Sequence, residues 1–168
     1  KRLDAEYYQP EYLTTQNILS HWPTKKLAEV CRVSDGNHMS ISESFLDAGV
    51  RYLRGKDLND FFVSDDDPIY IPNSEYEKLK RSYIFKNDVL VSIVGTVGMV
   101  SIVADDFDKL TGSCKIAILR GQKIDPWFLS GFLLSRYGQH QCRGATSEER
   151  RRQRHSNLNH SDLWRKGV

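Results

Sequence analysis

The strongest pattern in the chain is a pair of β-branched runs separated by a glycine-bounded turn. Seven Val or Ile residues fall within residues 89–94 and 99–103, on either side of Gly95-Thr96-Val97-Gly98. Such runs are typical of strands in a buried sheet, and glycine allows the backbone to reverse without a side chain in the way. The pattern predicts a central β-hairpin. Its turn hydroxyls, including Thr96, suit contact with a phosphate, although a hairpin that serves only as core is the more frequent case.

Three other segments have the apolar patterning of strands. Residues 27–33 predict a strand or the beginning of one, and 115–120 predict a second buried strand. Between them, residues 49–55 alternate apolar and basic side chains, which places Arg51 on the face opposite Val50 and Tyr52. A cluster of turn residues, 34–38, follows the first of these strands and predicts a polar loop.

Helices are predicted in three places. Pro10 suits the first turn of a short lead-in helix that ends near residue 22. Ser74 and Glu77 have the spacing of a capping box, which predicts a helix from there to about Arg81. Asp125-Pro126 predicts a helix that runs to about residue 138 and covers the sheet. Its expected apolar face consists of Trp127, Phe128, Phe132 and Leu133. Short strands with few helices indicate a mixed α/β (α+β) domain.

Length and composition indicate one domain with a real core. The chain has 168 residues, of which 39% are hydrophobic and 27% are charged. It has neither a membrane-length apolar run nor a signal-peptide pattern, so we expect a cytoplasmic protein without a membrane partner. It begins with Lys1 rather than Met, which suggests a piece of a longer protein.

The cysteines and acidic residues give no sign of a metal or cofactor. The three cysteines lack a C-x-x-C spacing and are expected to be reduced. Asp65-Asp66-Asp67 lacks the glycine and glutamate of a calcium loop, so a solvated turn is the better interpretation. The chain also lacks the G-K-[ST] phosphate loop, the G-x-G-x-x-G fingerprint and the G-x-S-x-G elbow. We therefore expect neither a stand-alone enzyme nor a cofactor.

Charge is distributed unevenly along the chain. The net charge is +2, yet residues 143–168 hold seven Lys or Arg against three Asp or Glu, and the rest holds 17 against 19. This asymmetry favours a polyanionic partner. Residues 143–160 are predicted to include an exposed basic loop. A solvated loop and a phosphate-contacting segment are about equally favoured for residues 147–155.

The order of several short motifs resembles a known family. The motifs are Leu3-Asp4-Ala5-Glu6-Tyr7-Tyr8-Gln9-Pro10, then Asp35-Gly36-x-His38, then Gly49-Val50-x-Tyr52-Leu53-Arg54 with Lys56-Asp57-Leu58, then 88–98 with its Gly-Thr-x-Gly turn, and finally the aromatic helix and 157–163. Together they resemble the target recognition domains of type I restriction-modification specificity subunits, and the equivalent domains of fused restriction-methylation enzymes. Residues 148–154, and the end of the chain without the family's prolines or helical spacer, depart from the pattern.

This resemblance implies a single target recognition domain over residues 1–168, with a twisted, mainly antiparallel sheet or partial barrel flanked by short helices. Such a module binds double-stranded DNA without catalysis and directs methyltransferase and restriction subunits to their site. The alternative is the C-terminal recognition domain of a fused type IIG enzyme. A protein-interaction module without a DNA role is a third possibility, and it predicts an exposed apolar patch instead of a basic concave face.

Candidate contact residues fall into two groups. Base reading is expected of polar side chains on loops, and backbone contact of the basic ones. The candidates for base reading are Asn37, His38, Ser40 and Thr96. The candidates for backbone contact are Arg51, Arg54, Lys56, Arg143, Arg150, Arg151, Arg152 and Arg154.

Overall fold

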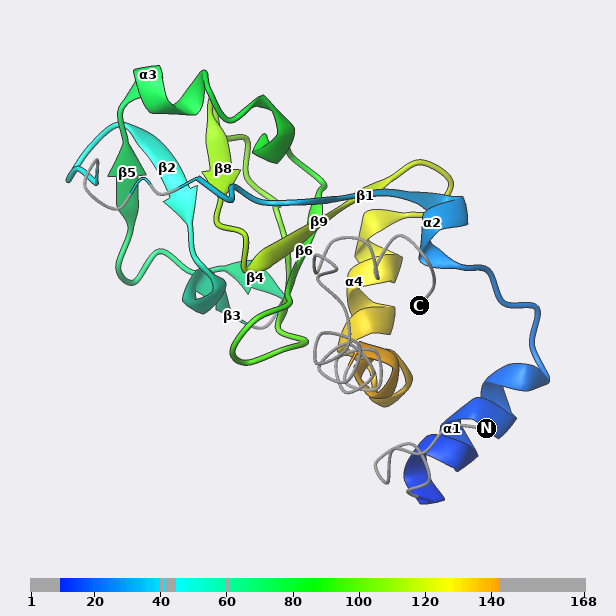
Figure 1. Ribbon diagram of the computed structural model, residues 1–168. Coiled ribbons are helices and arrows are strands. Elements are labelled where there is room, and N and C mark those ends of the chain that lie inside the picture. The colour runs from blue at the N-terminus through cyan, green and yellow to red at the C-terminus, as the bar shows by residue number, and fades with distance from the viewer. Residues whose placement is uncertain (1–9, 40, 42–44, 60, 143–168) are drawn as a thin grey trace, which may run out of the picture.

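The computed structural model describes residues 10–39, 41, 45–59 and 61–142, and these residues form two sheets with short helices around them (Figure 1). The larger sheet has six strands in the order β1 (Cys31–Asp35), β9 (Ile116–Gly121), β6 (Val89–Ser92), β7 (Val100–Ile102), β4 (Phe62–Val63) and β3 (Leu58–Asn59). The smaller sheet has three strands in the order β5 (Ile69–Ile71), β2 (Val50–Leu53) and β8 (Leu110–Gly112).

Most strand pairs are antiparallel, and only β4 with β7 and β2 with β8 are parallel among the described residues. The mixed α/β class with a mainly antiparallel sheet is therefore confirmed. Within the described ranges neither sheet closes into a barrel. No helix in those ranges has the length and apolar character needed to cross a bilayer.

The predicted central hairpin is confirmed. Strands β6 and β7 pair with Val91 opposite Val100. Gly95 and Gly98 have φ angles of +82° and +89°, a region that L side chains rarely adopt. The Gly98 amide donates to the Ser92 carbonyl at 2.9 Å and closes the turn.

The central strands of the larger sheet, β9, β6 and β7, are buried on both faces, which explains their continuous apolar runs in the sequence. Successive residues of β6 point to opposite sides. Val89 and Val91 join a cluster beneath α4 (Pro126–Leu134), and Leu90 joins a second cluster with Leu53 of the smaller sheet. The hairpin strands thus connect two of the core clusters.

Helix α4 covers one face of the sheet, as predicted. It begins at the predicted cap, where the Asp125 side chain accepts a hydrogen bond from the Phe128 amide at 2.8 Å. It ends at Leu134, and helical backbone resumes over 136–142. The predicted apolar face is wrong in part, because Trp127 and Phe128 are 45% and 65% exposed. Leu133 is buried as predicted, together with Leu129 one turn before it and with Ser130.

The remaining helices are short. The predicted lead-in helix is confirmed as α1 (Pro10–Ser20), in which Thr15 bonds His140 across the chain at 2.7 Å. The strand predicted over 27–33 is wrong at its start. Residues Leu27–Val30 form a single helical turn, α2, because the Glu29 amide bonds back to the Lys26 carbonyl before the chain extends into β1.

The helix predicted from Ser74 to Arg81 is also wrong in length. It is divided into α3 (Asn73–Tyr76) and a 3₁₀ turn, η4 (Lys80–Ser82), and its cap is Pro72 without a side-chain bond. Hydrogen bonds from backbone amides to the carbonyl three residues earlier tighten the chain here, and Tyr76 and Leu79 lie in one buried cluster. A further 3₁₀ turn, η3 (Gly55–Asp57), follows β2.

Candidate nucleic-acid interface

Four connecting segments meet at one end of the larger sheet. Because β1, β9, β6 and β7 alternate in direction, the chain leaves β1 and β6 at the same end of the sheet where it enters β9 and β7. Residues 36–39, 93–99 and 113–115 lie at this end. The parallel pairing of β2 with β8 brings residues 54–57 beside them. We call these four segments the loop end of the sheets.

Backbone hydrogen bonds connect two of the loop-end segments to residues 112–114, where the chain leaves β8. The Asn37 amide donates to the Gly112 carbonyl at 2.6 Å, and the Cys114 amide donates to the Asn37 carbonyl at 2.8 Å. On the other side, the Ser113 amide donates to the Leu53 carbonyl at 2.9 Å. Loops that are far apart in the sequence are thus held in fixed positions by main-chain bonds.

A cleft of about 810 Å³ opens at the loop end. Its lining includes three cationic side chains, three neutral polar ones and two aromatic rings. The cations are Arg54, Lys56 and Lys115, the neutral polar residues are Asn59, Thr96 and Ser113, and the rings are Phe45 and Tyr52. The structure therefore brings three sequence-predicted candidates, Arg54, Lys56 and Thr96, into one concave surface.

Arg54 is fixed by a buried carboxylate. Its Nε and Nη2 atoms donate to the two oxygens of Asp57 at 3.1 and 2.9 Å, and Asp57 is only 4% exposed. Asp57 also accepts the Arg54 amide at 2.7 Å. These bonds to Asp57 are the main cause of the raised pKa of Arg54. The guanidinium is therefore a permanent cation in a defined orientation.

The acidic turn, residues 65–67, contacts Lys56 of η3 and Arg54, the N-cap residue of η3. Lys56 Nζ is 2.5 Å from Asp67 Oδ2, and Arg54 Nη2 is 3.3 Å from the same oxygen. These contacts, led by the one with Lys56, lower the pKa of the exposed Asp67 carboxyl. Asp65, Asp66 and Asp67 are exposed, in agreement with the predicted solvated turn.

Arg51 is turned into the protein and is only 4% exposed. Its Nη2 donates to the Ser64 carbonyl at 3.0 Å and lies 3.5 Å from Asp65 Oδ1. The alternation of residues 49–55 suggested an outward face, but β2 is the central strand of its sheet and all four of its residues are buried. Arg51 lines a second hollow, of about 700 Å³, next to Tyr70.

In the central hairpin, Thr96 is exposed, whereas the hydroxyls of the two serines are hydrogen-bonded within the protein. Thr96 is exposed beside Gly95. The Ser92 hydroxyl donates to the Thr96 carbonyl at 2.5 Å and accepts the Met99 amide at 2.9 Å. The hydroxyl of Ser101 donates to the Phe62 carbonyl at 3.0 Å. Ser92 therefore holds the turn in shape, Ser101 joins β7 to β4, and Thr96 is left at the surface of the turn.

The loop after β1 contains one inward and one outward candidate. Asn37 is 5% exposed, and its amide group bonds both the Met39 amide, at 2.7 Å, and the Met39 carbonyl, at 2.8 Å. His38 has a side chain 55% exposed, with Nε2 2.5 Å from Oδ2 of the buried Asp35. Since a carboxylate only accepts, Nε2 carries the hydrogen.

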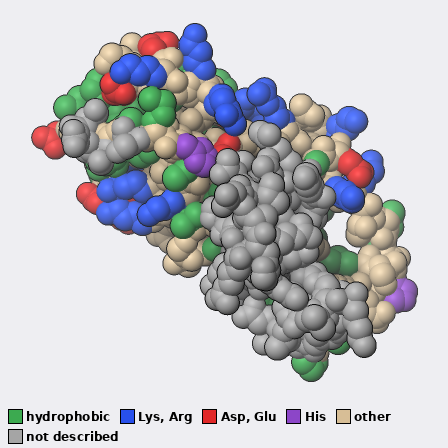
Figure 2. Space-filling model, viewed as in Figure 1, with side chains coloured by type: hydrophobic (Ala, Val, Ile, Leu, Met, Phe, Trp, Pro, Cys, Tyr) green, Lys and Arg blue, Asp and Glu red, His purple; other side chains and the backbone are tan. Residues whose placement is uncertain are grey.

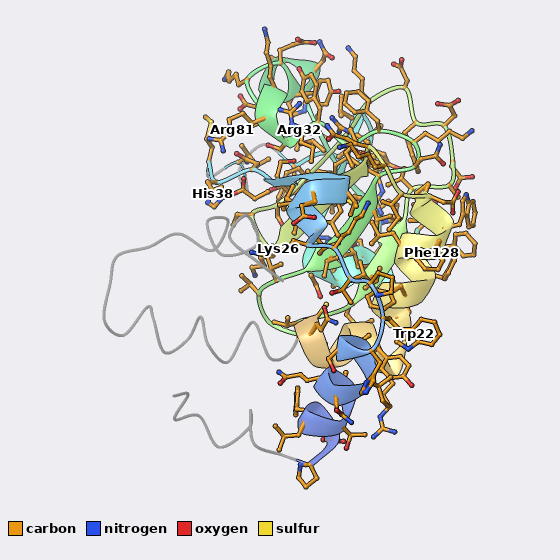
Figure 3. All side chains as sticks on the ribbon, turned by 90° about the vertical axis from the view of Figure 1, so that its right-hand side faces the viewer. Trp22, Lys26, Arg32, His38, Arg81 and Phe128 are labelled. Atoms are coloured by element: carbon orange, nitrogen blue, oxygen red, sulfur yellow. The ribbon has the colours of Figure 1, made fainter. Side chains whose placement is uncertain are left out.

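Basic side chains continue beyond the cleft. Figure 2 shows the Lys and Arg side chains of one face in a group over η3 and in a longer group along the margin over α3, β1 and α2. Figure 3 shows Lys26, Arg32, His38 and Arg81 away from the side that carries Trp22 and Phe128. Arg81 Nη2 is 3.7 Å from Oδ1 of Asp35, the residue that also contacts His38, so the second group of basic side chains adjoins His38.

The other six candidates, Ser40, Arg143, Arg150, Arg151, Arg152 and Arg154, lie outside the described residues, so they remain predictions. Conversely, the sequence interpretation missed Lys115 and Asn59 as cleft residues. The signal for Lys115 is its position directly before a buried strand, at the edge where loops gather. For Asn59 no comparable signal exists, because its position depends on the short pairing of β3 with β4.

The chemistry of the cleft is that of binding. Its cations suit oxyanions, and its amide and hydroxyl groups suit hydrogen bonding. Burial raises the pKa of Tyr52, against the opposing effect of a hydrogen bond from Asn37, so the phenol keeps its proton at neutral pH. Across the described ranges, no group of three His, Cys, Asp or Glu residues has the geometry of a metal site.

Comparison with known proteins identifies the fold. No protein-family model and no curated protein matches the sequence. Among solved structures, a chain from work on the assembly and conformational transition of the type I R-M system matches with a TM-score of 0.52 and 15% identity, covering 86% of this chain and 44% of that one. The HsdS subunit from Thermoanaerobacter tengcongensis matches with a TM-score of 0.50 and 15% identity, covering 96% and 49%.

The chain spans less than half the length of either matched structure. The resemblance drawn from the sequence motifs is therefore confirmed at the level of fold, and the length matched is consistent with one recognition domain. This chain has the fold of about half of an HsdS subunit of a type I restriction-modification system.

Proposed function

We propose that the chain is the target recognition domain of a specificity subunit, and that it binds duplex DNA with the loop end of its sheets. The observation that carries this proposal is the cleft, in which Arg54, Lys56 and Lys115 surround neutral hydrogen-bonding side chains at the point where four rigid loops converge. Cations position a phosphate backbone, and neutral polar groups on loops read base edges.

In this proposal the exposed and the buried candidates have different roles. Lys115, Lys56 and Arg54 contact phosphates. Thr96 at the hairpin turn and His38 at the loop end contact bases, where the hydroxyl donates or accepts and the imidazole offers Nδ1, because Nε2 is bonded to Asp35. Asn37 and Arg51 act indirectly, because their side chains are engaged in holding the loops.

The domain has no catalytic role in this proposal. It determines where methyltransferase and restriction subunits act, and it works in the cytoplasm, where the host DNA lies. A single domain of low net charge binds weakly by itself, because affinity is shared with the rest of the assembly. The basic segment 150–154 adds further phosphate contacts, which predicts a loss of duplex affinity in the double variant Arg151→Ala, Arg152→Ala.

The test is binding selection from a randomised duplex library with the full chain, followed by affinity measurements over a range of salt concentrations. We expect an enriched sequence motif that weakens or changes at one position in Thr96→Ala. Lys115→Ala should weaken binding to all duplexes alike and reduce the slope of log affinity against log salt by about 1.

The matched control is Lys123→Ala. Lys115 precedes β9 and Lys123 follows it, so the two exposed lysines lie at opposite ends of one strand. The Lys123 variant should keep the wild-type salt slope. An unenriched library, together with equal slopes for both lysine variants and the wild type, would contradict the proposed function.

A further inference from the structure

Arg54, the N-cap residue of η3, and Lys56 within η3 converge on one carboxylate oxygen. Lys56 Nζ lies 2.5 Å and Arg54 Nη2 lies 3.3 Å from Asp67 Oδ2. Arg54 also donates to the main-chain carbonyl of Asp67. The Asp67 side chain is 65% exposed, so its carboxylate occupies the outer surface of the pair and is in contact with solvent.

Arg54 does not depend on Asp67 for its position. Arg54 is held from behind by the buried Asp57, and the Ser64 amide donates to the Asp57 carbonyl at 2.8 Å. Arg51 anchors the start of the acidic turn through the Ser64 carbonyl. The turn is therefore fixed at its base, while the carboxylate of Asp67 lies at the surface and is able to rotate away.

We propose that Arg54 and Lys56 form a subsite for one phosphate group of a nucleic-acid backbone, and that the Asp67 carboxylate fills this subsite in the free protein. This inference rests on the proposed function. A carboxylate oxygen and a phosphate oxygen accept hydrogen bonds from the same cationic donors. Binding then exchanges one anion for another, and Asp67 competes with the DNA.

Asp67 is a weak competitor because its carboxylate is exposed to solvent. Surface ion pairs contribute little because water and salt screen them, so a phosphate placed by the remaining contacts of the cleft is able to displace the carboxylate. Asp67 is nevertheless ionised at neutral pH, since Lys56 and then Arg54 lower its pKa. The competitor is therefore present under every condition in which DNA binding is measured.

Asp67→Asn tests the subsite directly. Asparagine keeps the shape of the side chain and the main-chain carbonyl that Arg54 contacts, but it removes the competing charge. Duplex affinity of the full chain should rise about threefold to tenfold, the range for two exposed ion pairs. Asp66→Asn is the matched control, because it removes the same charge from the same turn while its carboxylate bonds only Ser64 in the structure. It should raise affinity less than twofold.

A double-variant cycle separates local competition from general repulsion. In a Lys56→Met background the gain from Asp67→Asn should fall by at least half, because one of the two released donors is absent. A gain that persists undiminished in that background, or one equal to the gain from Asp66→Asn, would overturn the subsite. Chemical unfolding of each variant confirms that it is folded under the assay conditions.

The same measurements distinguish failure of this inference from failure of the proposed function. If Lys115→Ala weakens duplex binding while Asp67→Asn leaves it unchanged, the loop end binds DNA and only the phosphate subsite is wrong. If neither Lys115→Ala nor Lys56→Met weakens binding, the proposed interface itself is wrong.

Discussion

Gly36 is the point at which the loop after β1 crosses the segment after β8, and Gly36→Ala tests this crossing. A Cβ atom at Gly36 would lie 2.0 Å from the Ser113 carbonyl oxygen and 2.5 Å from that of Gly112. Both neighbours are main-chain atoms in a hydrogen-bonded segment, so a rotamer change gives no relief. The two segments must separate by more than 1 Å to reach ordinary contact distance.

Separation on this scale endangers three main-chain hydrogen bonds. They are Gly36 N to Ile116 O at 3.0 Å, Asn37 N to Gly112 O at 2.6 Å, and Cys114 N to Asn37 O at 2.8 Å. Each contributes about 1 kcal/mol net when lost with access to water. We therefore expect a loss of about 2–4 kcal/mol in the free energy of unfolding, which lowers the thermal midpoint by roughly 5–15 °C for a domain of this size.

Urea unfolding followed by tryptophan fluorescence measures this loss, with Gly131→Ala as the control. Gly131 lies in the interior of α4, and a Cβ there meets nothing within 4 Å. The control should be more stable than the wild type by about 0.5–1 kcal/mol, because alanine is the better helix former. A Gly36→Ala protein within 0.5 kcal/mol of the wild type would refute the close crossing at the loop end.

Two further predictions concern residues at the end of the larger sheet opposite the loop end. Asp88 is 1% exposed, and its carboxylate accepts hydrogen bonds from Arg120 Nε and Nη2 at 2.8 and 2.7 Å. Asp88→Ala should therefore lower the free energy of unfolding, measured in urea, by about 2–4 kcal/mol. A loss below 1 kcal/mol would contradict the pairing of this buried carboxylate with Arg120. Burial raises the pKa of Cys31 to about 11. At pH 8, iodoacetamide should therefore label the partly exposed Cys114 long before Cys31, which peptide mass spectrometry measures. Equal labelling rates in the folded protein would contradict the burial of Cys31.

The local pattern of the sequence was sufficient for elements whose signal lies within a few residues. The hairpin could be predicted because Gly95 and Gly98 punctuate two valine-rich runs, and both adopt positive φ. Helix α4 could be predicted because Asp125 and Pro126 are a cap and first-turn pair. In each case the neighbours along the chain determine the conformation, so the prediction does not depend on the rest of the fold.

Predictions failed where distant segments decide burial. Arg51 looked outward from the alternation around it, but β5 and β8 flank its strand and the side chain is buried. Trp127 and Phe128 looked like core because they are large and apolar, but α4 turns Leu129 and Leu133 to the sheet and leaves both aromatic side chains exposed. Apolar character along a sequence does not show which face of an element meets a partner.

The candidate site was only partly visible in the sequence for the same reason. Arg54, Lys56 and Thr96 could be named as contact residues from their charge or their place in a turn. Their convergence in one cleft follows from the parallel pairing of β2 with β8 and the alternation of β6, β7 and β9. Lys115 became apparent only after this topology was known.

The central claim is that nucleic acid contacts the loop end of the sheets, and lysine acetylation in the presence and absence of duplex DNA tests it most directly. At low salt and saturating duplex, we predict that Lys56 and Lys115 become several-fold less reactive, while the exposed Lys86 and Lys123 keep their rates. Protection of Lys86 and Lys123, with unchanged rates at Lys56 and Lys115, would contradict the account.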